Sequence, residues 1–185
     1  MSKAEAPSAY ERALRRLSRR EQTEAELRRA LSRAGHEEDE VEAALRRLRG
    51  QGFLDDAALA GRFARSRLAN LGHGRYRIRE ALRVRGVAPP TVEEGVRAAL
   101  SEVPEGEALD AVAKRYWGQR SSVEPRERLR KLTGVLLRRG FPAALVRERL
   151  QALWPDWAGE VLDEAGGDWP DGDGLESGDK VLHDE

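Results

Sequence analysis

The chain has 185 residues, of which 36% are charged and 5% are aromatic. It contains no cysteine, which excludes disulfides, thiolate zinc sites and cysteine nucleophiles. The sequence shows neither a signal peptide nor an apolar run of the ~20 residues that a membrane helix needs, so we expect a cytoplasmic protein without a membrane partner. Arg, Leu, Ala and Glu dominate the composition, and because these residues favour helices the sequence predicts an all-α fold.

The charge is distributed unevenly along the chain, although the formal net charge is zero. Residues 1–153 contain 32 basic and 22 acidic side chains, whereas residues 154–185 contain one basic and 11 acidic side chains. A basic body favours a polyanionic partner such as nucleic acid. The alternative is a solvated helix surface followed by a solubilising tail.

Residues 9–54 are expected to form three helices. Tyr10, Leu14 and Leu17 lie at positions i, i+4 and i+7, which places them on one face of a first helix. Thr23 followed by Glu26 predicts a capping box at the start of a second helix. Gly35 predicts the end of that helix, because glycine adopts a left-handed conformation without a steric penalty.

Two further blocks, residues 55–103 and 104–158, are expected to repeat this plan. Asp55 is predicted to cap the first helix of the second block. The opening helices of the two blocks carry apolar residues at helical spacing, Leu59 and Phe63 in one block and Leu109, Val112 and Tyr116 in the other. Pro90 and Pro142 lie near the starts of the last helices, where a missing N–H costs little.

The three blocks align with one another on Gly35, Gly86 and Gly140. In every block the residues eight and four positions before the glycine, and those six and ten positions after it, are apolar. They are Leu27, Leu31, Val41 and Leu45 in the first block, Ile78, Leu82, Val92 and Val96 in the second, and Leu132, Leu136, Val146 and Leu150 in the third. The pattern predicts three tandem three-helix repeats, which stabilise one another by stacking.

Residues 159–185 are predicted to form an acidic, disordered tail, because their glycines and carboxylates cannot bury a core. Trp154 and Trp157 are expected to pack over the last repeat as a cap. Asp171 and Asp173 have the spacing of calcium ligands, but the glycine and the further ligands that such a loop requires are missing, so we reject a calcium site.

Signals for an enzyme are poor. The sequence has no glycine loop followed by Lys and Ser or Thr, and none of His36, His73 and His183 has metal-ligand spacing to another histidine. Asp55 and Asp56 precede an apolar helix, which favours a helix cap over a catalytic pair. We therefore expect no catalytic residue, no metal and no cofactor.

Arginines are concentrated in the second block, where the segment from Arg62 to Arg85 contains eight arginines and one acid, Glu80. Arg75, Arg79 and Arg83, here called the middle arginine row, recur every four residues and share one helix face. Arginine forks match phosphate oxygens, and they equally suit an acidic protein surface. A solvated helix face is the alternative. The candidate binding residues are Arg62, Arg65, Arg67, Arg75, Arg77, Arg79 and Arg83.

A second basic cluster makes a weaker case of the same kind; it comprises Arg126, Arg128, Arg130, Lys131, Arg138 and Arg139. The glycine-terminated helix pairs also resemble helix-turn-helix units. However, the repeats lack a polar pattern of Asn and Gln for reading bases, so contact with the nucleic-acid backbone is the more natural expectation.

At these residues the sequence resembles the RecX family. The resemblance rests on Tyr10–Leu31 (YERALRRLSRREQTEAELRRAL), on GFLDD from Gly52, on FARSR from Phe63, and on Gly74–Gly86 (GRYRIREALRVRG). It spans roughly residues 9–153 and is strongest across residues 10–100. The combination of these segments is specific, whereas each fragment alone is weak. The acidic tail departs from the family pattern.

The resemblance implies tandem three-helix repeats that form an elongated, curved module. It implies a non-enzymatic regulator, expected as a monomer, that binds RecA filaments on single- or double-stranded DNA. Such binding usually restrains ATP hydrolysis, recombination and co-protease activity. The alternatives are a helix-turn-helix-like transcriptional regulator and, less favoured, a nuclease, which would need clustered acids that the body does not display.

Overall fold

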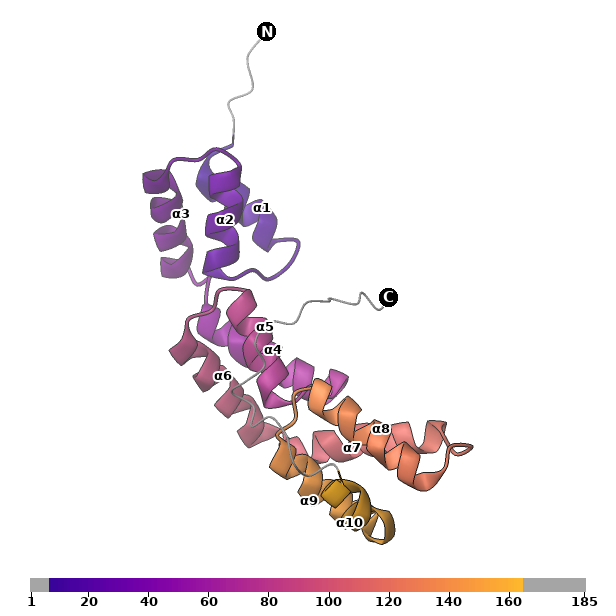
Figure 1. Ribbon diagram of the computed structural model, residues 1–185. Helices are drawn as coiled ribbons and strands as arrows, with labels where there is room; N and C mark the ends of the chain where they lie inside the picture. Colours follow the sequence, from indigo (N-terminus) through magenta and orange to yellow (C-terminus); the bar gives the residue numbers. More distant parts are fainter. Residues whose placement is uncertain (1–6, 165–185) are drawn as a thin grey trace. The chain divides into compact units, whose positions relative to one another are not determined.

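The computed structural model describes residues 7–164, and within this range all regular secondary structure is helical, as predicted. Figure 1 shows the elements in chain order. Their bounds are α1 Ala9–Leu17, α2 Glu24–Arg33, α3 Glu38–Gly50, α4 Asp56–Leu71, α5 Arg75–Val84, α6 Pro89–Glu102, α7 Glu105–Gln119, α8 Pro125–Arg138, α9 Ala143–Leu153 and α10 Pro155–Glu164. We keep 9–54, 55–103 and 104–158 as the predicted boundaries of the repeats.

The chain divides into two compact units. The first contains the residues up to Ser66 together with Arg79–Glu102, and the second contains Arg67–Ile78 together with the residues from Val103 on. The second repeat therefore contributes to both units, one part packing with the first repeat and the other with the third.

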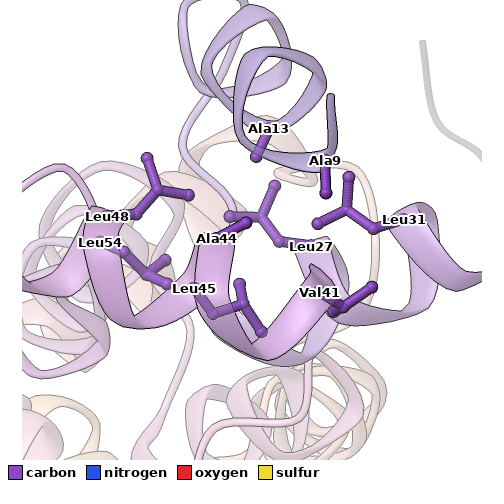
Figure 2. Packing of buried hydrophobic residues seen from close by; sticks show 9 residues of the cluster. All are labelled: Ala9, Ala13, Leu27, Leu31, Val41, Ala44, Leu45, Leu48 and Leu54. Carbon is purple, nitrogen blue, oxygen red and sulfur yellow. The ribbon is translucent and has the colours of Figure 1, made fainter. Parts of the chain in front are cut away.

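The first three helices enclose a small apolar core in the first unit. Figure 2 shows its side chains converging from α1, α2 and α3. The helix α1 contributes Ala9 and Ala13, which are fully buried, while Tyr10, Leu14 and Leu17 pack at the margin of the core and remain partly exposed. Small alanine side chains allow α1 to approach its neighbours closely, which is why the larger residues of the predicted stripe lie to the side.

All twelve aligned apolar positions of the three repeats are buried, with exposed fractions of 0–1%. The predicted capping box of Thr23 and Glu26 is confirmed, and Ser8 and Glu11 form another at the start of α1. Asp55 caps α4 by accepting a hydrogen bond from the Ala58 N–H at 2.8 Å. The sequence signals that position the helices thus act as predicted.

The three aligned glycines end α2, α5 and α8 in the same way. Each adopts a positive φ, from +80° to +85°, and its N–H donates to a carbonyl of the last helical turn. The next residue donates to the carbonyl five positions before it, as the N–H of Val87 does to Leu82 at 3.1 Å. This pattern of bonds is the Schellman motif, which satisfies carbonyls that the helix leaves unpaired.

The glycine ends of α5 and α8 also join neighbouring repeats. A Cβ atom on Gly86 would lie 2.4 Å from the Cβ of Ala25 in α2, and one on Gly140 would lie 2.3 Å from the backbone nitrogen of Arg77 in α5. The residue before each glycine also accepts a hydrogen bond at its carbonyl from the residue just before the contacted helix. Thr23 Oγ1, before α2, donates to Arg85 O, and the Gly74 N–H, before α5, donates to Arg139 O, both at 2.7 Å. We call these two contacts the glycine joints.

At the end of the chain the structure differs from the expectation. Residues 159–164 were predicted to belong to the tail, but they form the last six residues of α10, because Ala158 and Val161 are buried three residues apart on one helix face. Trp154 and Trp157 stack on Trp117 with ring centroids 4.3 and 5.7 Å away, which confirms the predicted cap. The tail residues 165–185, including the rejected calcium loop, lie outside the described residues.

Two glycine-to-alanine variants, compared with each other, test the glycine joint between α5 and α2. Gly35 and Gly86 share φ +85°, but a Cβ on Gly35 meets nothing within 4 Å. We expect Gly35→Ala to lower the free energy of unfolding by about 1 kcal/mol, the cost of the left-handed backbone. Gly86→Ala should lower it by about 3 kcal/mol, because the Ala25 contact adds an overpacking cost. Equal decreases in the free energy of unfolding, measured by urea-induced unfolding of the two variants, would contradict the close contact between Gly86 and Ala25.

Candidate interaction surfaces

Arg75, the first residue of the middle arginine row, is engaged with a buried acid. Its backbone N–H and Nε donate to the carboxylate of Glu105 at 2.7 and 2.6 Å. Glu105 begins α7 and is only 5% exposed. Since a buried carboxylate requires such partners, Arg75 holds the start of α7 in place, within the second unit.

Arg79 and Arg83 share one acid of α6 in the first unit. The Arg79 guanidinium lies 2.7 Å from the carboxylate of Glu93, and that of Arg83 lies 3.9 Å from it. Both arginines therefore face a neighbouring helix of their own repeat, and their positive charge is partly compensated.

Arg62 and Arg65 of α4 likewise have acidic partners. Arg62 pairs with Glu21 at 2.7 Å, and Arg65 pairs with Glu102 at 2.6 Å. About half of each side chain in these pairs is exposed. The partners are 41 and 37 residues away in sequence, which is why the low acid content of residues 62–85 did not predict the pairing.

Arg67 and Arg77, the remaining candidates, lie near His73 in the second unit. Burial, together with the positive charges of Arg77, Arg139 and Arg67, lowers the pKa of His73 to about 4. Arg77 is exposed and has no carboxylate within 4.0 Å among the described residues. The assignment of the seven arginines to a binding site stays a prediction.

Two members of the second basic cluster have structural roles. Arg128 is buried, donates to the carbonyls of Ser121 and Val123 at 2.8 and 2.6 Å, and lies over the ring of Trp117. Arg139 donates to the carbonyl of Leu71 at 2.6 Å. These guanidinium groups satisfy backbone carbonyls, so they are poorly placed to bind a partner.

Sequence reasoning missed two arginine-lined hollows in the first unit. One lies along α1 and contains Arg12, Arg15, Arg16 and Arg19. The other extends from Arg16 across α2 to the end of α5. The signal was present, because four arginines at i, i+3, i+4 and i+7 occupy one helix face.

A third hollow in the first unit has a mixed lining. Leu14, Leu17 and Leu59 line it beside Phe53, which is 56% exposed, together with polar side chains that include Glu21 and Arg62. Within residues 7–164 no three His, Asp or Glu side chains are grouped so that they could hold a metal ion. In the same range no helix is both long and apolar enough to cross a membrane.

The repeated helices and the glycine joints define a protein built from tandem three-helix repeats. Family models described as the first, second and third three-helix domains of RecX match residues 9–48, 55–96 and 105–150. The chain therefore belongs to the RecX family.

Similar proteins agree with this assignment. The chain is 41% identical over 158 residues to a protein of Halorhodospira halophila named Regulatory protein RecX, covering 84% of the chain and 96% of the relative. A protein of the same name from Trichlorobacter lovleyi is 34% identical over 75% of the chain and 91% of the relative. The crystal structure of RecX from Lactobacillus salivarius matches with a TM-score of 0.70 at 21% identity, over 78% of the chain and 94% of that structure, which shows a shared fold.

A comparison of two arginines in α5 tests the role of Arg75. Arg75→Ala leaves the buried carboxylate of Glu105 without its guanidinium, so we expect the free energy of unfolding to fall by about 2 kcal/mol. Arg83→Ala breaks only a long, exposed pair and should change stability by less than about 0.5 kcal/mol. Chemical unfolding of both variants measures the difference, and equal effects would contradict a structural role for Arg75.

His73 should make stability depend on pH. Because its pKa is about 4 in the folded protein and 6.5 unperturbed, the unfolded chain binds the proton more tightly. The contribution of neutral His73 to the free energy of unfolding is therefore fully present above pH 6.5, and it is lost as the pH falls toward 4. The variant His73→Gln should lose this component of the pH dependence. Titration of the His73 ring near pH 6.5 in NMR spectra would contradict the account.

Proposed function

We propose that the protein binds RecA filaments assembled on DNA and modulates RecA, mostly by inhibiting its ATPase, recombinase and co-protease activities. It does so in the cytoplasm, as a monomer and without catalysis. The observation that carries the proposal is the match of a RecX domain to each of the three repeats. The name of the relatives, Regulatory protein RecX, supports a regulatory role.

The proposed mechanism is multivalent. A RecA filament presents the same surface at regular intervals, and a chain of similar repeats offers several contacts to it. Individually weak contacts then become strong only on the assembled filament, because each bound contact raises the effective concentration of the next. The glycine joints support this mechanism, since they limit the freedom of neighbouring repeats and lower the entropy lost on binding.

The arginines of α4 and α5 contribute by exchanging partners. Exposed ion pairs such as Arg62–Glu21 and Arg65–Glu102 stabilise a fold by only about 0–1 kcal/mol, so an acidic partner can replace the internal carboxylate at little cost. The exposed and long ion pair of Arg83 with Glu93 can be exchanged for an acidic partner at similarly little cost. Arg75 is a weaker candidate, because its removal from Glu105 would leave a buried charge.

The test is RecA-catalysed ATP hydrolysis and strand exchange on DNA, measured with and without the full chain. We expect a saturable decrease in both activities, and unchanged activity at saturating protein would refute the proposal. A variant with Arg62→Ala, Arg65→Ala and Arg83→Ala should require more protein for the same effect. The matched control removes three other exposed arginines, Arg46→Ala, Arg97→Ala and Arg115→Ala, and should behave as the unmodified chain.

A further inference from the structure

The face of α1 that carries Arg12, Arg15, Arg16 and Arg19 is hollowed and strongly basic. These four arginines and Pro7 line one depression in the first unit. They recur at helical spacing, so their guanidinium groups follow one line along the helix and into the turn after it. Glu11, the acid nearest to them in sequence, caps the Ser8 N–H.

A second depression continues this face. It shares Arg16 with the first and adds Arg20, Arg29, Arg33 and Arg85, with Glu26 as its acid. Together the two depressions form a continuous set of eight arginines from α1, α2 and the end of α5. We call this set the first-repeat arginine surface.

The charge of this surface is only partly compensated, because Glu26 pairs with both Arg20 and Arg85. Glu26 accepts hydrogen bonds from the Thr23 N–H at 2.9 Å and from Arg85 at 3.0 Å, so its carboxylate is already occupied. Arg15, Arg19 and Arg33 are exposed and, among the described residues, have no carboxylate within 4.0 Å. In contrast, Arg62, Arg65, Arg75, Arg79 and Arg83 each pair with a glutamate.

The chemistry of the surface favours a sugar–phosphate backbone over an acidic protein. Ala30 and Val84 are the apolar residues of the second depression, and Pro7 is that of the first. Neither depression contains an aromatic side chain, and Val84, which is 67% exposed, is the one large apolar side chain that lines them, whereas protein interfaces use several such anchors at their centres. Interfaces with nucleic acid are instead polar and strongly positive, and guanidinium forks bind phosphate oxygens in pairs.

We propose that the first-repeat arginine surface binds the phosphate backbone of nucleic acid without reading its sequence. The inference deepens the proposed function, because it assigns the DNA contact to the first repeat and leaves the arginines of α4 and α5 for the protein partner. It predicts binding to naked DNA, so it can be tested with no RecA present.

The experiment measures binding of the full chain to a fluorescently labelled random-sequence oligonucleotide by anisotropy, over a series of salt concentrations. The variant carries Arg15→Ala, Arg19→Ala and Arg33→Ala, which removes three exposed arginines. We expect the affinity near physiological salt to fall roughly tenfold or more, and the slope of log K against log salt to fall by about 2 to 3. Circular dichroism should show unchanged helicity.

The control variant Arg46→Ala, Arg97→Ala and Arg115→Ala loses the same net charge from other exposed positions and should bind like the unmodified chain. Equal losses in both variants would overturn the inference, because net charge alone would then explain binding. Absence of DNA binding by the unmodified chain, or displacement of the DNA by poly-glutamate at equal charge concentration, would overturn it as well.

Failure of the inference is distinguishable from failure of the proposed function. If the chain binds DNA through this surface but leaves RecA activity unchanged, the surface assignment stands and the regulatory role fails. If the chain inhibits RecA and the variant with Arg15, Arg19 and Arg33 replaced by Ala binds naked DNA as well as the unmodified chain, the regulatory role stands and the surface assignment is wrong.

Discussion

The architecture depends on the contact between the glycine end of one helix and the start of a helix in the preceding repeat. Both glycine joints use the same positions of the repeat. The residue before the glycine, Arg85 in one joint and Arg139 in the other, offers its carbonyl to the helix start and donates its guanidinium to the loop before that helix. A small repeat has a thin core and is marginally stable alone, so this polar and close-packed contact is what makes a chain of repeats a stable protein.

Much of the fold could be predicted because its determinants are local in sequence. The apolar spacing, the capping boxes and the glycines act within one or two helical turns, and their alignment across three repeats removes the ambiguity of any single copy. The helix α10 was missed in part because it lies outside the threefold pattern. Its burial depends on Ala158 and Val161, two modest apolar residues within an acidic segment, and the helix packs on α8 and α9.

The candidate site was harder to predict because ion pairs depend on tertiary structure. The segment from Arg62 to Arg85 is poor in acids, but Glu21, Glu93, Glu102 and Glu105 reach it from other helices. The opposite holds for α1, where Arg15 and Arg19 lie in an ordinary mixed sequence and acquire no acidic partner in the described fold. A count of charges along the chain therefore located the basic residues, but it could not show which of them have acidic partners in the fold. Availability for a polyanion depends on what each guanidinium already contacts.

The glycine joint can be examined directly through the amides that form it. In native-state hydrogen exchange, the N–H groups of Gly74 and Tyr76, which donate to Arg139 O and Gly140 O at 2.7 and 3.1 Å, report on the joint between the second and third repeats. We predict that both amides exchange as slowly as those of the buried residues Leu132 and Leu136 in α8, because they open only when the joint unfolds. Exchange at the rate of exposed turn amides such as that of Ser122 would show that the repeats are not held together in this way.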